Sequence, residues 1–152
     1  MDVVIEYTEE VKTSLTKDFF QAVAARTLEE CHFTFLQDKA IRINVVALSE
    51  AKIQQLNHTY RGKDKVTDIL SFGEYVTRVS LAAETAQEIF LGELFFCPSF
   101  VEQAAQEDGV SFEHEMVYIF SHGVLHLVGF DHEEAMFTIQ DTITFLFSKK
   151  AV

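Results

Sequence analysis

Three of the six histidines in this chain lie within residues 122–132, and their spacing strongly constrains how that part of the chain can fold. His122 and His126 are four residues apart, so in a helix their side chains project from one face, one turn apart. Gly129 can adopt the positive φ that ends a helix and turns the chain back, which would bring His132 to the same point. The segment therefore predicts a helix that ends just before a tight turn, with three imidazoles converging there.

Three neutral imidazoles are ligands that zinc prefers, and they leave the fourth tetrahedral position open to water, as in catalytic zinc sites. We therefore expect His122, His126 and His132 to hold one Zn²⁺ per chain. Asp131 could orient one of the rings by a hydrogen bond. The alternative is that these are partly buried core histidines on an apolar helix, but the convergent spacing favours a metal site.

The residue after the first histidine distinguishes this segment from the common zinc-peptidase motif. In HExxH the glutamate directly after the first histidine is the general base. Here that position is Gly123. The metal prediction is unaffected, but the interpretation as a zinc peptidase is weakened.

Hydrophobic periodicity predicts a mixed α+β architecture. Ser49 and Gly62 are typical of the start and end of one helix, and Ser111 is a candidate N-cap for the longest one. We expect strands over residues 3–7, 41–46, 66–72 and 89–97, and helices over residues 16–32, 49–62, 98–109, 112–127 and 133–147. The prediction is one domain over residues 1–152, with an approximately four-stranded mixed sheet packed against four to five helices. Fifteen Phe and no Trp point to a phenylalanine-rich core.

The formal net charge of -12 disfavours simple electrostatic coating of nucleic acid, because an unspecialised duplex-DNA binder is usually basic. One short segment has the opposite sign. Residues 51–65 contain Lys52, Arg61, Lys63 and Lys65 against the single acid Asp64. This segment could form a positive lip on a negative body, although a solvated loop would explain Lys63 and Lys65 equally well.

Two further features bear on the compartment. Cys31 and Cys97 are the only cysteines and have no CxxC spacing, so we expect free thiols in a reducing, cytoplasmic environment. No secretory leader is apparent, and the apolar run over residues 116–130 is too short to span a bilayer and carries two histidines. No association with a membrane is expected.

The sequence HGVLHLVGFDH over residues 122–132 resembles the HGxLHLxGYDH signature of the YbeY family of bacterial endoribonucleases. A second block, NHTYRGKDKVTDILSF over residues 57–72, is similar to the family's N-x-x-YR-x-x-D-x-PTDVLSF. LGEL over residues 91–94 resembles the family's LGDI. The chain departs from these patterns at Val66, where the family usually has Pro, at Glu93 for Asp, and at Phe130 for Tyr.

The resemblance implies a single YbeY-like metallohydrolase domain with a zincin-like metal site. It implies a single-strand-specific, zinc-dependent endoribonuclease that acts on an rRNA precursor in 16S rRNA 3′-end maturation and ribosome quality control. The small ribosomal subunit would be its partner, and DNA would not be a substrate. Carried over by position, His122, His126 and His132 become the metal ligands, and Arg61 becomes the residue that faces the substrate phosphate. Lys63 and Lys65 would assist in binding RNA.

Two other functions remain open from the sequence. One is a metal-dependent peptidase or amide hydrolase that takes its carboxylate from elsewhere in the chain. The other is a non-catalytic, ribosome-associated module in which zinc only stabilises the C-terminal helices. Arg61 in its motif favours the ribonuclease over the peptidase, and an open coordination position favours either enzyme over the module.

Overall fold

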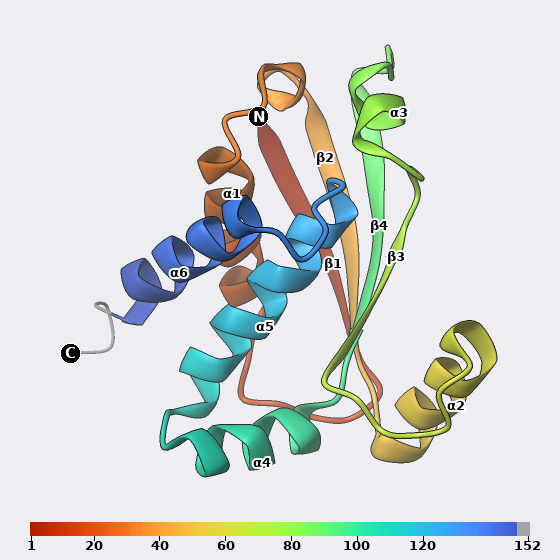
Figure 1. Cartoon of the computed structure of the whole chain (residues 1–152), viewed down its shortest axis with the longest axis vertical. Coiled ribbons are helices and arrows are strands. Elements are labelled where there is room, and N and C mark those ends of the chain that lie inside the picture. Colours follow the sequence, from red (N-terminus) through yellow and green to blue (C-terminus); the bar gives the residue numbers. More distant parts are fainter. Residues whose placement is uncertain (149–152) are drawn as a thin grey trace.

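The computed structural model describes residues 1–148 (Figure 1). The strands are β1 (Asp2–Glu9), β2 (Ala40–Ala47), β3 (Ile69–Gly73) and β4 (Glu88–Phe96). The helices are α1 (Lys17–Glu30), α2 (Glu50–Arg61), α3 (Arg78–Ala82), α4 (Pro98–Asp108), α5 (Phe112–Leu127) and α6 (Glu134–Ser148), with a 3₁₀ turn at Thr34–Leu36. The expected α+β class and four-stranded sheet are confirmed.

The sheet is mixed, with strand order β1-β2-β4-β3. β1, β2 and β4 run parallel, and β3 pairs antiparallel with β4 at the edge. In Figure 1, α5 crosses in front of the sheet, with α1 and α6 beside it. Contacts of α5 with α1, α4, α6, β3 and β4 make it the central helix of the domain.

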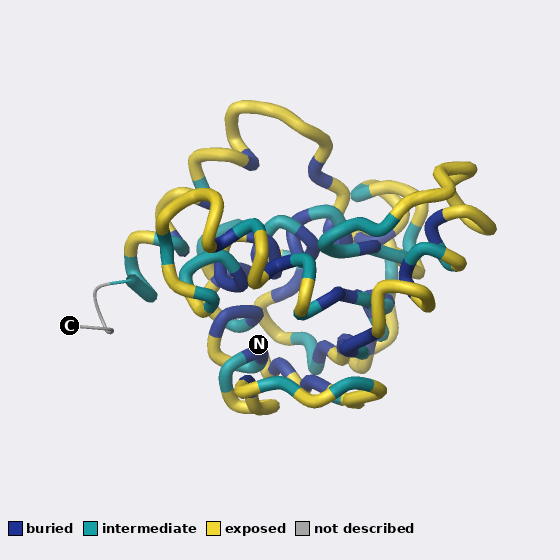
Figure 2. Tube along the Cα trace, turned by 90° about the horizontal axis from the view of Figure 1, so that it is seen from below, coloured by how far each residue is buried: buried dark blue, intermediate teal, exposed yellow. Residues whose placement is uncertain are grey.

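Alternation along the strands divides the core between the two faces of the sheet. Val45 of β2 and Leu94 of β4 belong to the large cluster under α1 and α5, whereas their neighbours Val46 and Phe95 pack with the smaller cluster that includes Ile53 of α2. Figure 2 shows the buried segments gathered in the interior, with exposed loops and helix turns around them.

The large cluster contains the phenylalanine packing that the composition predicts. The ring of Phe20 lies 4.9 Å from that of Phe120, 5.5 Å from that of Phe96 and 4.7 Å from that of Tyr7, measured between centroids. Such aromatic pairs contribute roughly 0.5–1.5 kcal/mol each beyond their buried area. The rings join α1, α5 and the sheet, which anchors the middle of α5.

The structure differs from the prediction in the number of helices and in where β3 begins. Residues 1–148 contain six α-helices rather than four or five, because the short helix α3 was missed; Thr77 and Ser80 form its capping box. β3 begins at Ile69 rather than at Val66. Ile69 pairs with Phe96, the last residue of β4, so the residues before Ile69 have no strand beside them.

None of the helices within residues 1–148 has the length and continuous apolarity that a bilayer-spanning helix needs.

Candidate metal centre and groove

The last two turns of α5 carry His122 and His126, and the turn after α5 brings His132 to them. Ser111 caps the helix, and Gly129 adopts a φ of +90° just past its end, both as predicted. The Nε2 atoms of His122 and His126 lie 2.9 Å apart, and those of His122 and His132 lie 3.3 Å apart. The three predicted histidines therefore converge, with all three ligand atoms within 4.8 Å of one another.

The hydrogen bond at Nδ1 defines the tautomer of His126. Nδ1 lies 2.8 Å from the carbonyl oxygen of Phe130. A carbonyl oxygen can only accept, so Nδ1 carries a proton, and in the neutral ring Nε2 presents its lone pair to the other two rings. The supporting acceptor is thus the backbone of Phe130 rather than the Asp131 side chain that we considered from the sequence.

Gln140 has the same function for His122. Its Nε2 donates to the carbonyl oxygen of Tyr118 at 2.9 Å, so its Oε1 faces Nδ1 of His122 at 3.4 Å. Gln140 is completely buried, so this orientation is enforced by its need for partners. Burial lowers the pKa of the His122 imidazole, and the neighbouring His126 lowers it further. The neutral, ligating form of His122 is favoured.

These separations suit a metal ion. Two nitrogens that each lie about 2.0–2.1 Å from a tetrahedral zinc ion are about 3.3 Å apart. The observed 2.9 Å and 3.3 Å are close to that value. In the neutral tautomers that the Phe130 and Gln140 contacts favour, the Nε2 lone pairs of His122 and His126 face each other 2.9 Å apart, an arrangement that a bound cation would stabilise. The three histidines could therefore hold a metal ion.

Arg78 of α3 supports the turn that carries His132. Its Nε donates to the carbonyl oxygen of Val128 at 3.2 Å, and its Nη2 donates to that of Gly129 at 3.3 Å. The guanidinium also lies over the ring of Phe130, 4.2 Å from the centroid. A Cβ at Gly129 would lie 2.9 Å from the Cβ of Arg78. Both the positive φ and this close contact require glycine here.

We expect Arg78→Ala to weaken metal binding by about 10-fold or more, the usual effect of removing a group that orients a ligand. The turn at 128–130 would lose two hydrogen bonds, and the Phe130 carbonyl and His132 would be held less firmly. Competition with a chromophoric chelator measures the affinity. Arg26→Ala, which removes an exposed arginine paired with Glu29 and Glu30 on α1, is the control. Unchanged metal affinity in Arg78→Ala would show that the turn holds its shape unaided.

The three histidines lie in a groove of about 680 Å³. Two segments of the chain form its wall, one within residues 57–71 and the other within residues 118–140. The three histidines, Arg61, Lys63, Lys65 and Asp68 all line it. Three of the four residues proposed as the positive lip are thus brought to the metal centre. The fourth, Lys52, is exposed on α2 and is not part of the wall.

Arg61 ends α2 and is exposed to solvent. Its Nη2 donates to the carbonyl oxygen of Ser71 at 2.6 Å, and its guanidinium lies over the Phe72 ring, 4.7 Å from the centroid. Within residues 1–148 it forms no salt bridge with a carboxylate. Many surface arginines form an ion pair with a carboxylate. Arg61 does not form such a pair with any residue in the described part of the chain.

The loop with Lys63 and Lys65 is held in place by α2. Asn57 is buried, and its Nδ2 donates to the carbonyl oxygen of Lys65 at 2.9 Å. Asp64 is held by Gln54, whose Nε2 lies 3.1 Å from Oδ1. Gly62 provides the left-handed C-cap with a φ of +71°, as predicted. The two lysines are exposed, and hydrogen bonds from α2 hold the backbone that carries them.

The structure also explains the missing HExxH glutamate. A Cβ at Gly123 would lie 3.0 Å from both Ile69 Cδ1 and Leu94 Cδ2, because α5 packs closely on β3 and β4 there. A side chain at this position would have to displace both of these groups. The packing therefore disfavours a glutamate at the place where the HExxH motif requires its base.

Sequence reasoning missed Gln140 and Arg78 and gave Asp68 no role. Gln140 had a detectable signal: it lies four residues after Met136 and three before Ile143, on the buried face of α6. A lone amide on an apolar face needs a partner. Asp68 provides the one carboxylate in the described wall of the groove, and its charge favours the protonated form of His122.

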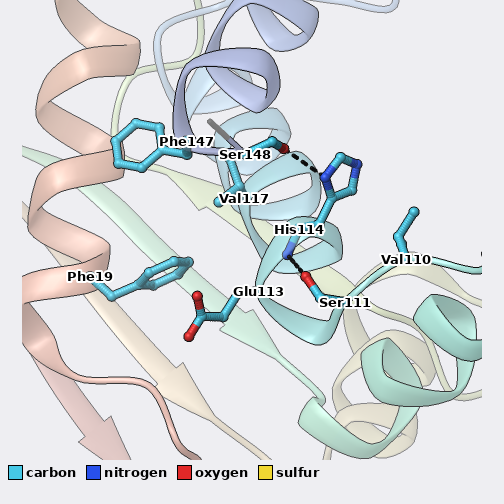
Figure 3. Close-up of a pocket in the computed structure, with 8 residues that line it drawn as sticks. All are labelled: Phe19, Val110, Ser111, Glu113, His114, Val117, Phe147 and Ser148. Atoms are coloured by element: carbon cyan, nitrogen blue, oxygen red, sulfur yellow. Dashed lines mark hydrogen bonds between the residues drawn. The ribbon is translucent and has the colours of Figure 1, made fainter. Parts of the chain in front are cut away.

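A second cavity, of about 360 Å³, lies between α1, α5 and α6 (Figure 3). His114 faces it and is hydrogen bonded through Nδ1 to the Ser148 hydroxyl at 2.7 Å, while its backbone nitrogen donates to Ser111 Oγ. The remaining lining includes Phe19, Val117 and one carboxylate, Glu113. No metal-ligand cluster of the described residues lies here.

Fold and site together define an α+β protein with a tri-histidine centre that could hold a metal ion, in a groove with three basic side chains. The model of the endoribonuclease YbeY family matches residues 5–145. The chain belongs to this family, which confirms the resemblance found in the sequence.

The chain is also similar to individual proteins of this family. The chain is 37% identical to the endoribonuclease YbeY of Ureaplasma urealyticum serovar 10 over 123 residues, which is 75% of this chain and 63% of the relative. It is 38% identical to that of Thermotoga maritima over 93 residues, 61% of this chain and 55% of the relative. It is 36% identical to that of Staphylococcus aureus over 115 residues, which is 71% of this chain and 73% of the relative. The match thus spans less than two thirds of the first two relatives.

Among solved structures, the fold is similar to a solution structure of a Thermotoga maritima protein. The TM-score is 0.59 at 29% sequence identity, and the match covers 93% of this chain and 87% of the other. The similarity extends over nearly the whole fold.

Proposed function

We propose that the chain is a single-strand-specific, zinc-dependent endoribonuclease that acts on the rRNA precursor in 16S rRNA 3′-end maturation and ribosome quality control. Membership of the endoribonuclease YbeY family supports the ribonuclease activity. The observation that carries the proposal is that Arg61 and the three histidines line one groove. A group suited to phosphate and a centre suited to a metal therefore act on the same bound molecule.

Arg61 is the residue that we assign to the scissile phosphate. A guanidinium has five N–H donors in a planar array, and only some of them are used by the Ser71 and Tyr60 carbonyls. Those contacts and the Phe72 ring orient the group in advance, so little reorganisation is needed when a phosphate gains charge in the transition state. Lys63 and Lys65 would hold the neighbouring phosphates.

His122, His126 and His132 are the residues that would hold one zinc ion. When bound, the ion would supply Lewis-acid chemistry, either polarising a phosphoryl oxygen or making a water molecule more acidic. The contribution of the protein is to keep the Nε2 lone pairs free and aimed at one point through Phe130 and Gln140.

A purely structural metal is less well supported. Of the three histidines, His132 is exposed and the other two are half-buried, so they lie at the edge of the domain rather than in its core. α6 is joined to the domain by apolar residues of its own, since Met136 and Ile143 belong to the large core cluster. The C-terminal helices therefore have a packed core to hold them together.

The charge distribution favours RNA entry along one face. The groove wall carries three basic side chains and one carboxylate, on a chain whose formal net charge is -12. The rest of the surface repels a polyanion and would direct it to the groove. We place the protein in the cytoplasm at the small ribosomal subunit, where Cys31 and Cys97 would remain the free thiols that they are here.

The proposal is tested with purified, zinc-loaded protein and an end-labelled single-stranded RNA from the 16S rRNA precursor. We expect endonucleolytic cleavage that stops when a chelator removes the metal, with little cleavage of the same RNA in a duplex or of the corresponding DNA. Cleavage of a protein or peptide instead of RNA would support the amidase alternative. Full metal content without any hydrolysis would support the non-catalytic module.

The few basic groups in the groove predict a moderate salt dependence of RNA binding. If Arg61, Lys63 and Lys65 neutralise about three phosphates, log Kd should vary with log salt with a slope of about 2. Fluorescence anisotropy with a short single strand measures this slope, and replacing Lys63 and Lys65 together by Ala should reduce it to below about 1. Lys17→Ala is the control, because Lys17 is exposed at the start of α1 and lies outside the groove. A slope near zero would exclude these residues as phosphate contacts.

A further inference from the structure

Two large aromatic side chains stand exposed beside the metal centre. Tyr118 of α5 is 39% exposed and Phe137 of α6 is 41% exposed. Both line the groove that contains the three histidines and Arg61. Neither ring belongs to the hydrophobic clusters formed by the described residues. Packing of the core therefore does not account for either ring.

Both rings are held on rigid elements. Tyr118 lies one helical turn before His122, and its carbonyl oxygen accepts hydrogen bonds from Gln140 and from Ser121. Phe137 lies in the first turn of α6, and its ring stacks against that of His132, with an interplanar angle of 21° and a centroid distance of 6.2 Å. Gln140 ties the two helices together at this point. The helices that carry the two rings are thus joined beside the groove, and the Phe137 ring is also stacked on that of His132.

The composition of the groove indicates what these rings bind. One chain segment of the wall contributes Arg61, Lys63 and Lys65, and the other contributes Tyr118 and Phe137. A strand of nucleic acid has the same two kinds of surface, a charged phosphate backbone and flat bases. Bases stack on aromatic side chains when they are unpaired, whereas the bases of a duplex are already stacked and enclosed. The charge and the rings together match a single strand.

We propose that Tyr118 and Phe137 form a stacking platform for unpaired bases of the RNA strand whose phosphate Arg61 holds. This inference rests on the ribonuclease function proposed above and adds a reason for single-strand specificity. A flexible strand can place its phosphates on the basic segment and its bases on the two rings at the same time. A duplex can reach the basic segment but has no unpaired base to place on the rings.

The test is equilibrium binding of two short probes of equal length by the zinc-loaded protein at one salt concentration. One probe is single-stranded oligouridylate with 2′-O-methyl groups, and the other is the same ribose-phosphate chain without bases. We expect Tyr118→Ala and Phe137→Ala each to weaken binding of the first probe by about 5- to 100-fold. Binding of the abasic probe should be unchanged by either substitution. Phe145→Ala, which removes a 60% exposed ring two turns further along α6 and outside the groove, should affect neither probe.

Metal content and RNA cleavage are measured on the same samples. If Phe137→Ala loses metal, or weakens both probes equally, then the ring only positions His132 and the stacking platform is wrong. If both variants bind oligouridylate like the unaltered protein, the platform is also wrong, while the ribonuclease proposal stands as long as the unaltered protein cleaves RNA. If the unaltered protein neither binds nor cleaves single-stranded RNA, the proposed function itself fails.

Discussion

Arg61→Ala is expected to lower the rate of RNA cleavage by about 100-fold or more while the zinc content and the fold remain unchanged. An effect of this size is usual when one preorganised charge donor is removed from a reaction that develops charge. Arg61 is exposed, lines the groove and has no salt bridge within residues 1–148, so its removal leaves no buried charge behind. The measurement is single-turnover cleavage of a labelled single strand.

Two further variants test whether the effect is specific to the guanidinium of Arg61. Arg61→Lys should recover little activity, because an ammonium group lacks the planar donor array and does not stack on Phe72 in the same way. Arg42→Ala is a matched control, since Arg42 is also an exposed arginine over a phenylalanine ring, 4.8 Å from the centroid of Phe90, but lies outside the groove. Cleavage by Arg61→Ala at close to the normal rate would refute the assigned role.

His126→Ala is expected to abolish nearly all metal binding. The Nε2 atom of His126 lies 2.9 Å from that of His122, and its Nδ1 is held by the Phe130 carbonyl. Loss of a ligand should reduce the affinity well beyond the roughly 10- to 100-fold that loss of a supporting group costs. Elemental analysis after dialysis should find about one zinc ion per chain in the unaltered protein and almost none in the variant.

His114→Ala provides the control for this experiment. His114 lies on the same helix, three turns earlier, and faces the second cavity rather than the groove (Figure 3). It should keep its metal, and circular dichroism should find both variants folded. Equal metal content in His126→Ala and the unaltered protein would disprove the tri-histidine centre.

The local features of the site were predictable because they depend on neighbours in the chain. Helical spacing places His122 below His126, and only the freedom of glycine at Gly129 lets the chain return with His132. The caps at Ser49, Gly62 and Ser111 follow from the same local chemistry. All of these predictions are confirmed by the structure.

The supporting contacts were not predictable because they join distant parts of the chain. Arg78 contacts the turn at 128–129 from a five-residue helix fifty positions away. Gln140 reaches His122 from α6, and β3 starts where its partner β4 ends. Arg61 could be placed with the histidines only by resemblance to a family, since nothing local links residue 61 to residue 122.

The three histidines lie close together in the sequence, and this affects how metal binding is coupled to folding. The loop that a bound ion would close runs only from residue 122 to residue 132, and the entropy of closing a loop grows with its length. The sheet, by contrast, pairs strands about forty residues apart, such as β1 with β2. A cross-link this short therefore restricts the unfolded chain less than a long one would. A bound ion would stabilise the protein mainly because the groups that aim its ligands, Gln140 and the Phe130 carbonyl, are in place only when the chain is folded. The free energy of unfolding should then rise with the concentration of the free ion.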